Sequence, residues 1–243
     1  MALDKKTFTT RTTTAVIFAI LMLAGLLVNT YTFLLLTTII HFGCWYEFVK
    51  LMKKASGRFS VIHFLVGISY ISIPLFTFAA LSLAPAMPKI SLVSDLDSIP
   101  NMFSNFSPLL PVLTILAIWI NDTMAYICGS LIGKTPFSPI SPKKTWEGTI
   151  GGIVLCIVLM ATLGYLLPIG QALAPVHWIF IAATAAIAGT IGDLFESKLK
   201  RDAGVKDSGS FMPGHGGFLD RFDSLLLAAP GVWLYVQLFL SKS

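Results

Sequence analysis

Residues 192–224 read GDLFESKLKRDAGVKDSGSFMPGHGGFLDRFDS, a charged and glycine-rich stretch in an otherwise apolar chain. The ionisable side chains between its Glu196 and Asp223 are Glu196, Lys198, Lys200, Arg201, Asp202, Lys206, Asp207, Asp220, Arg221 and Asp223. Basic side chains can hold phosphates, carboxylates can hold a divalent cation, and glycine-rich loops can approach a phosphate closely. The stretch therefore indicates nucleotide chemistry, and its place at the edge of apolar segments indicates a lipid substrate.

The rest of the chain has the composition of a membrane protein. Hydrophobic residues make up 55% of the sequence, and the mean hydropathy is +0.80. Runs of about 18 or more nearly uncharged residues recur, which is the length a helix needs to cross a bilayer. We expect an all-α polytopic integral membrane protein with about seven transmembrane helices. The expected spans are 14–29, 31–48, 61–84, 109–133, 149–168, 176–197 and 224–240.

We expect these spans to form a single transmembrane domain over residues 1–243. N-terminal helices would occupy 1–108, and the catalytic part would occupy 109–243. The first span is short for a bilayer. A second apolar run follows it at once, which predicts a membrane span rather than a cleaved signal peptide.

The positions of Lys and Arg predict the orientation of the spans. If the N-terminus is inside, all but two of the 17 basic residues lie in the N-terminal segment and in 49–60, 134–148 and 198–223. The two exceptions are Lys89 and Lys242. Because basic residues concentrate in cytoplasmic loops, we expect a cytoplasmic N-terminus and a polar cavity open to the cytosol.

Two groups of polar side chains flank the charged loop at helical spacing. They are Asp193, Glu196, Ser197 and Lys200 on one side, and Asp220, Asp223 and Ser224 on the other. Each group shares a helix face, and the two groups meet if the connection between them folds back. Magnesium commonly binds one or two carboxylates together with phosphate oxygens. The simpler interpretation is that these acids cap helices or form ion pairs, and it is weakest for Asp193, which lies inside an apolar run.

Three other segments carry polar groups of interest. The loop Pro213-Gly214-His215-Gly216-Gly217 can bring backbone N–H groups close to a phosphate, although most such loops are only turns. Asn121-Asp122 lies about 12 residues before Lys134, roughly 18 Å along a helix, so it predicts a hydrated cavity or a structural interhelical hydrogen bond. Ser141–Gly148 predicts an ordered loop with Lys143 and Lys144.

Together these residues resemble the signature of the phosphatidate cytidylyltransferase (CDP-diacylglycerol synthase) family. The signature-like residues are Ser197-x-Leu199-Lys200-Arg201, Lys206-Asp207, Pro213-x-His215-Gly216-Gly217 and Asp220-Arg221-x-Asp223. Asn121-Asp122 and Ser141–Gly148 are similar to the family's second block. Met212 stands where the family usually has Leu, Ile or Phe. Members of the family often have more spans than the seven expected here.

The resemblance implies an integral enzyme of the inner (cytoplasmic) membrane that is commonly a homodimer. It also implies Mg²⁺ as the cofactor, and whether a second cation binds is left undecided. The enzyme would join CTP and phosphatidic acid in the lipid bilayer to give CDP-diacylglycerol and pyrophosphate, and no nucleic-acid partner is expected. The implied metal ligands are Asp193, Asp220 and Asp223, and the expected catalytic residues are these three with Lys200 and Arg201. The expected substrate-binding residues are Asn121, Asp122, Lys143, Lys144, Ser197, Lys206, Asp207, His215, Gly216, Gly217 and Arg221.

Two other functions remain open on the sequence. A CTP-dependent polyprenol or lipid kinase would transfer the γ-phosphoryl group and release CDP instead of pyrophosphate. An ion-coupled transporter could use Asp122 and Asp193 as a buried ion path. A transporter would need polar groups toward both membrane faces, whereas the outer ends of the expected spans hold few of them.

Overall fold

A computed structural model of the chain describes residues 5–84, 106–211 and 216–240. Its helices are α1 (Lys5–Leu27), α2 (Thr30–Ser56), α3 (Val61–Gly67), the π-helical turn η1 (Ile68–Ser72), α4 (Ile73–Leu81), α5 (Leu109–Ile132), α6 (Trp146–Leu166), the 3₁₀ turn η3 (Pro168–Ala172), α7 (Pro175–Asp202) and α8 (Leu219–Phe239). A short antiparallel hairpin, β1 (Pro136–Ser138) and β2 (Ser141–Thr145), joins α5 to α6. The expected all-α class is confirmed.

The membrane-crossing capacity of the helices follows from their length and composition. Among the described residues, 6 helical segments are long and apolar enough to cross a membrane. They are Thr30–Ser56, Val61–Leu81, Leu109–Ile132, Trp146–Leu166, Pro175–Asp202 and Leu219–Phe239. The first expected span corresponds to Thr12–Leu27 of α1, a shorter apolar section. The chain is therefore a polytopic membrane protein, and a seventh crossing stays a prediction.

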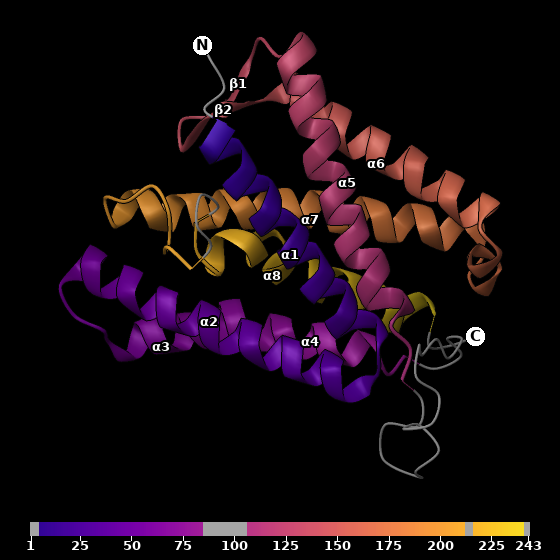
Figure 1. The fold of residues 1–243 in the computed structure, drawn as a ribbon, viewed down its shortest axis with the longest axis horizontal. Helices are drawn as coiled ribbons and strands as arrows, with labels where there is room; N and C mark the ends of the chain where they lie inside the picture. Colours follow the sequence, from indigo (N-terminus) through magenta and orange to yellow (C-terminus); the bar gives the residue numbers. More distant parts are fainter. Residues whose placement is uncertain (1–4, 85–105, 212–215, 241–243) are drawn as a thin grey trace.

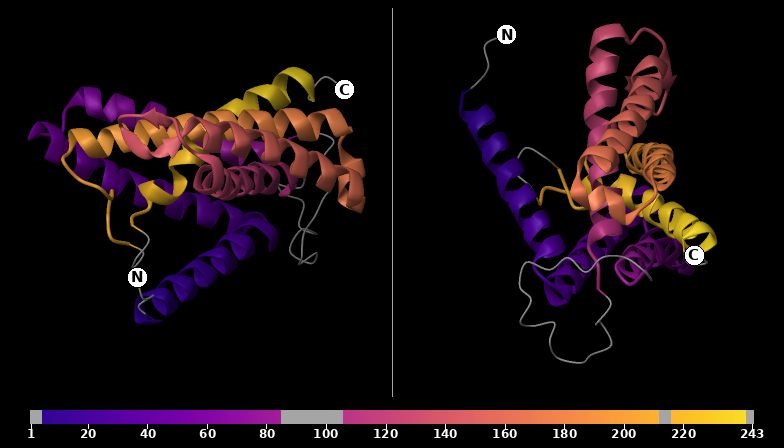
Figure 2. Two further views of the ribbon diagram at one scale, coloured as in Figure 1. Left: turned by 90° about the horizontal axis from the view of Figure 1, so that it is seen from above. Right: turned by 90° about the vertical axis from the view of Figure 1, so that its right-hand side faces the viewer.

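The helices form layers around α7 and α8. These two helices lie between α2–α4 on one side and the α5–α6 pair on the other, and they pack closely against each other (Figures 1 and 2). Helix α1 packs against α2 and reaches the start of α8, where the rings of Phe18 and Phe222 are 5.9 Å apart. The centre of the fold is thus built from the two helices that carry the charged segment.

Consecutive helices run in alternate directions, which gathers the basic connections. In Figure 1 the connections 57–60 and 133–145 and the segment 203–211 lie toward one side of the molecule, whereas 28–29 and 167–174 lie toward the other. This grouping agrees with the segregation of Lys and Arg in the sequence. Lys89 and Lys242 lie outside the described residues, and the cytoplasmic location of the basic side stays a prediction.

Local sequence signals set the helix boundaries near the site. Asn29 and Thr32 form a reciprocal capping box that starts α2, and Gly57 ends this helix at φ +74°, a left-handed conformation that glycine adopts without strain. Thr145 caps α6 by accepting a hydrogen bond from the Gly148 N–H at 3.1 Å. The hairpin therefore leads directly into a capped helix.

Small residues let the helices around the site approach closely. A Cβ placed on Gly148 would lie 2.8 Å from the carbonyl oxygen of Ala125, and one on Gly152 would lie 2.7 Å from the Ala125 Cβ. Both contacts are too short for real atoms, so α5 and α6 need glycine at these positions. Close approach of helices at small residues is a general feature of membrane proteins.

Candidate active site

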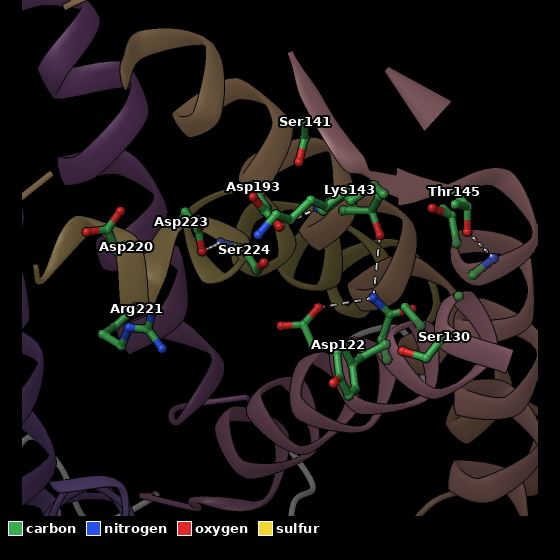
Figure 3. A pocket seen from close by; sticks show the side chains of 18 of the residues that line it. Asp122, Ser130, Ser141, Lys143, Thr145, Asp193, Asp220, Arg221, Asp223 and Ser224 are labelled. Carbon is green, nitrogen blue, oxygen red and sulfur yellow. Dashed lines mark hydrogen bonds and ion pairs between the residues drawn. The ribbon is translucent and has the colours of Figure 1, made fainter. Parts of the chain in front are cut away.

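A cavity of ≈ 600 Å³ lies where α5, the hairpin, α6, α7 and α8 meet. Its lining residues are Asn121, Asp122, Ala125, Tyr126, Gly129, Ser130, Ser141, Lys143, Lys144, Thr145, Gly148, Thr149, Thr190, Asp193, Lys200, Asp207, Asp220, Arg221, Asp223 and Ser224. Figure 3 shows Asp193 and Asp223 near the middle of the view, with Asp220 and Arg221 to one side and Thr145 to the other. The structure thus brings together residues that lie up to a hundred positions apart in the sequence.

The hairpin carries Lys144 to the acid that the sequence singled out on α7. The Lys144 ammonium group forms an ion pair with Asp193, and both side chains are partly buried. Glu147 anchors the base of the hairpin, because its carboxylate accepts hydrogen bonds from the Thr135 N–H at 3.1 Å and the Thr135 hydroxyl at 2.8 Å. The hairpin is therefore an ordered wall of the cavity, as the sequence predicted.

Lys200 lies between two carboxylates and ties α7 to α8. It forms an ion pair with Glu196 one turn earlier on α7, and its Nζ donates a hydrogen bond to Asp220 Oδ1 at 2.7 Å. The Lys200 side chain is only 13% exposed, and the Glu196 side chain is fully buried. Because buried charges are stable only when they are paired, this triad sets how the two helices meet.

The other oxygen of Asp220 is held by the connection between α7 and α8. Asp220 Oδ2 accepts hydrogen bonds from the Ser208 N–H at 2.9 Å, the Gly217 N–H at 2.8 Å and the Ser208 hydroxyl at 3.0 Å. Both Asp220 oxygens are thus engaged with protein donors. In this arrangement Asp220 organises the loop as well as facing the cavity.

Asp223 has a different environment, although it lies one turn along the same helix. It is 9% exposed, and its Oδ1 accepts a hydrogen bond from the Ser224 N–H at 2.7 Å. None of the ion pairs among the described residues involves Asp223. Gly192 of α7 packs against the Asp223 backbone, and the neighbouring Asp193 lines the same cavity as Asp223.

Asn121 and Asp122 form the deep wall of the cavity on α5. Asn121 is buried, and its Nδ2 lies 3.4 Å from both Asp122 Oδ1 and Thr190 Oγ1. The contact with Thr190 joins α5 to α7, which supports the structural interpretation of Asn121. The Asp122 carboxylate lines the same cavity as Asp193, which supports the cavity interpretation of Asp122.

Acids outnumber cations in the lining of the cavity. The acidic side chains are Asp122, Asp193, Asp207, Asp220 and Asp223, and the basic ones are Lys143, Lys144, Lys200 and Arg221. Two of the cations are already paired, Lys144 with Asp193 and Lys200 with Asp220. Among the described ion pairs, none uses Lys143 or Arg221. Side chains alone therefore offer few free positive charges to a phosphate ligand.

This acidic balance fits a divalent cation chemically. Carboxylate oxygens are the ligands that Mg²⁺ prefers, and Mg²⁺ keeps most of its shell for water and phosphate oxygens. Within the described part of the chain, no group of three or more Asp, Glu, His or Cys side chains is placed to hold a metal together. The expected ligands Asp193, Asp220 and Asp223 are thus not assembled as one group. A cation bound by at most two of them remains compatible with the cavity.

The remaining predicted site residues lie around the rim of the cavity or beyond it. Ser197 is buried on α7, where its hydroxyl donates a hydrogen bond to Asp193 Oδ1 at 3.3 Å. Arg201 is exposed and its Nε lies 3.4 Å from the carbonyl oxygen of Ile140 in the hairpin. Lys206 is exposed outside the lining. The geometry supports a direct role least for Arg201 and Lys206.

The glycine-rich loop is described only in part. Gly216 has φ +86°, a conformation that favours glycine, and the Gly217 N–H points at Asp220. Met212, Pro213, Gly214 and His215 lie outside the described residues, so the prediction for His215 stays untested. Gly217 holds the carboxylate of Asp220 and Gly216 packs beside it, and neither glycine lines the cavity.

One residue of the site was missed by the sequence reasoning. Glu47 of α2 is buried at 4% exposure and contacts the connection between α7 and α8. The signal was present, because Glu47 is an ionisable residue in an apolar helix, which was the argument applied to Asp193.

The fold and the site define a polytopic membrane protein with a charged cavity built from α5 to α8. Residues 87–239, more than half of the chain, match the cytidylyltransferase family, and the chain belongs to this family.

Several curated proteins are similar to this chain over about half of its length. A protein named phosphatidate cytidylyltransferase from Bacillus subtilis is 45% identical over 128 residues, which cover 51% of this chain and 46% of that protein. One with the same name from Helicobacter pylori is 40% identical over 131 residues, covering 54% and 48%. Phosphatidate cytidylyltransferase 4, chloroplastic, from Arabidopsis thaliana is 46% identical over 117 residues, covering 48% and 29%. The chain thus spans less than half the length of these relatives.

Proposed function

We propose that this protein transfers the cytidylyl group of CTP to phosphatidic acid, giving CDP-diacylglycerol and pyrophosphate. The observation that carries the proposal is the charged cavity, which the family-matching segments form among helices of membrane-crossing length. A lipid whose acyl chains stay in the bilayer and a water-soluble nucleotide can meet only at such a border. The names of the similar proteins support the same reaction.

In the proposed reaction, a phosphate oxygen of phosphatidic acid forms a bond to the α-phosphorus of CTP, and the bond from that phosphorus to pyrophosphate breaks. A phosphate monoester is largely ionised near neutral pH because its second pKa is about 6. No strong general base is needed. The main obstacle is the repulsion between two polyanions, so the protein has to supply positive charge and hold the reactants in line.

The side chains of the cavity divide this work. Lys143 and Arg221, which form no described ion pair, would bind phosphate oxygens directly. Lys144 would release Asp193, its ion-pair partner in this structure, and bind a phosphate instead. Lys200 would stay between Glu196 and Asp220 and keep the cavity walls of α7 and α8 in place.

We further propose Mg²⁺ as the cofactor, with Asp193 and Asp223 as its protein ligands and Asp220 as an alternative that would first release its hydrogen bonds. A bound magnesium ion would supply the Lewis-acid stabilisation of the leaving phosphate oxygens. Asp193 and Asp223 are favoured because both line the cavity where α7 packs against α8, and because Asp223 forms no ion pair among the described residues.

The location and assembly follow from the same proposal. We place the protein in the inner (cytoplasmic) membrane with the cavity toward the cytosol, where CTP is present, and as a homodimer. Reaction of a cysteine introduced at Ser210 with a membrane-impermeant reagent, in whole cells and in inverted vesicles, tests the orientation. Mass measurement of the purified protein in detergent tests the dimer.

One experiment tests the reaction itself. Purified protein is incubated with phosphatidic acid, Mg²⁺ and each of the four ribonucleoside triphosphates, and pyrophosphate and the lipid product are measured. Release of pyrophosphate with CTP, together with CDP-diacylglycerol, is the expected result. Release of CDP would instead identify a lipid kinase, and the absence of both products would reject nucleotide transfer.

A further inference from the structure

Glu47 stands apart from the other acids of the molecule. It lies on α2, in the N-terminal part of the chain that precedes the family-matching residues 87–239. Its side chain is 4% exposed, and no Lys, Arg or His among the described residues forms an ion pair with it. A buried carboxylate without a cation is costly, so its hydrogen-bond partners need an explanation.

The partners of Glu47 are the two ends of one loop. Its Oε2 accepts a hydrogen bond from the Ser208 hydroxyl at 2.7 Å and another from the Leu219 N–H at 2.9 Å. Ser208 lies shortly after the end of α7, and Leu219 is the first residue of α8. One oxygen of the Glu47 carboxylate is therefore bonded to both ends of the connection between α7 and α8.

Two glycines leave room for this carboxylate. A Cβ on Gly209 or on Gly217 would overlap the Glu47 carboxylate. Gly209 follows Ser208 directly, and Gly217 precedes Leu219 by two residues. The backbone on both sides of the loop thus packs onto Glu47 where any larger residue would push it away.

The contacts continue from Glu47 to the cavity. Ser208, which donates to Glu47, also contacts Asp220 Oδ2 through its N–H and its hydroxyl, and Gly217 donates to the same oxygen. The Ser208 hydroxyl carries one hydrogen, so Glu47 and Asp220 share it. Asp220 in turn accepts from Lys200, which lines the cavity with it.

We propose that Glu47 is a positioning residue of the active site, through which α2 fixes the loop between α7 and α8 and thereby orients Asp220 and Lys200. The inference rests on the proposed cytidylyl transfer for its activity measurement only. Glu47 does not line the cavity, so it acts through Ser208, Gly217 and the start of α8. An N-terminal helix outside the family match thus completes the site.

A positioning role differs from a general structural role in what it changes. Loss of general stability lowers the amount of folded protein but leaves the KM of the remaining folded molecules unchanged. Loss of loop position raises the KM for the nucleotide, because the start of α8 shifts and its Arg221 no longer lies where it would bind phosphate oxygens. A lost hydrogen bond to a charged group corresponds to about a tenfold or larger effect.

The test compares Glu47→Gln, Glu47→Asp and Ser208→Ala with the unchanged protein in detergent. Asp202→Asn is the matched control, because it also turns a carboxylate into an amide but at an exposed ion pair with Lys198. Hydrogen–deuterium exchange of peptides covering 205–219 is measured without substrate. The KM for CTP, the KM for phosphatidic acid and kcat are then measured on the folded fraction.

We expect Glu47→Gln to speed exchange in 205–219 about tenfold or more while α5 and α6 stay protected, and to raise the KM for CTP by a similar factor. Glu47→Asp should fall between, and Asp202→Asn should match the unchanged protein. If Glu47→Gln does not fold, Ser208→Ala decides by the same two readouts. Unchanged exchange and a KM for CTP within twofold would overturn the inference. An unchanged protein without transferase activity would reject the proposed function, while the exchange experiment would still test Glu47.

Discussion

The N-terminal helices α1–α4 and the C-terminal part from α5 to α8 are built from different side chains. The interior of the first is apolar and aromatic, with the rings of Phe33, Phe78 and Phe106 in contact at 5.5–5.6 Å. The interior of the second contains the charged cavity and the Lys200 triad. In a bilayer, ionisable groups are expensive and occur where function requires them. The difference therefore separates a scaffold from a reactive part.

Glu47 is the exception that links the two parts. It is the buried acidic residue of α2, and its hydrogen-bond partners among the described residues, Ser208 and Leu219, belong to the C-terminal part. The scaffold thus does more than fill space beside the cavity. The comparison can be tested by substitutions that act on one part and spare the other.

The largest effect is expected for Asp223→Asn in the reactive part. Turnover should fall by at least about 100-fold, because a proposed cation ligand is lost. Thermal stability should stay the same or rise, since the substitution removes a buried carboxylate that has no cationic partner among the described residues. Paired measurements of turnover and of the melting temperature in detergent check both statements. Near-normal turnover would remove Asp223 from the proposed mechanism.

Asp220→Asn should behave differently, although Asp220 lies one turn away. The change breaks the buried contact with Lys200 and weakens the bonds to Ser208 and Gly217. Breaking a buried ion pair costs about 3 kcal/mol or more, so both stability and turnover should fall. The measurement compares the melting temperatures of Asp220→Asn and Asp223→Asn in detergent. Equal stability of the two variants would show that the Lys200 triad does not hold α7 against α8.

The sequence was sufficient to predict the reactive part in outline. Helical spacing placed Asp193 with Lys200 on one helix face and Asp220 with Asp223 on another, and the structure brings both faces to one cavity. The all-α membrane class followed from hydrophobic runs, which depend on composition alone. These predictions concern neighbours along one helix, where spacing fixes geometry.

Contacts between distant segments could not be predicted in this way. No spacing rule relates Lys144 to Asp193 or Glu47 to Ser208, because these contacts depend on how α2, the hairpin and α7 pack. Spacing also could not choose between Asp220 and Asp223 as a cation ligand. That choice depends on which carboxylate pairs with Lys200 in the folded chain, and the structure pairs Asp220. Helix ends differed from expectation for a related reason: α2 extends to Ser56 and α8 begins at Leu219, since polar turns of a helix continue beyond its apolar section.

A substitution in the scaffold should have the opposite profile from Asp223→Asn. Phe78 of α4 is fully buried against Phe33. Phe78→Ala should lower the free energy of unfolding by about 3–5 kcal/mol through lost packing, while turnover per folded molecule stays within about twofold. Active-site titration of the folded fraction separates the two quantities. A large loss of turnover per folded molecule would mean that packing in α4 reaches the cavity.

The smallest effect is expected at the exposed end of α7, away from the cavity. Lys198 donates to Asp202 at 2.6 Å, but the two side chains are 54% and 47% exposed. Exposed ion pairs contribute about 0–1 kcal/mol because water and salt screen them. Asp202→Asn should therefore change the melting temperature by no more than a degree or two and leave the KM for CTP unchanged, when both are measured at low and at physiological salt. A clear effect on the KM for CTP would show that the exposed Lys198–Asp202 pair influences nucleotide binding, and the functional charged network would then extend beyond Lys200.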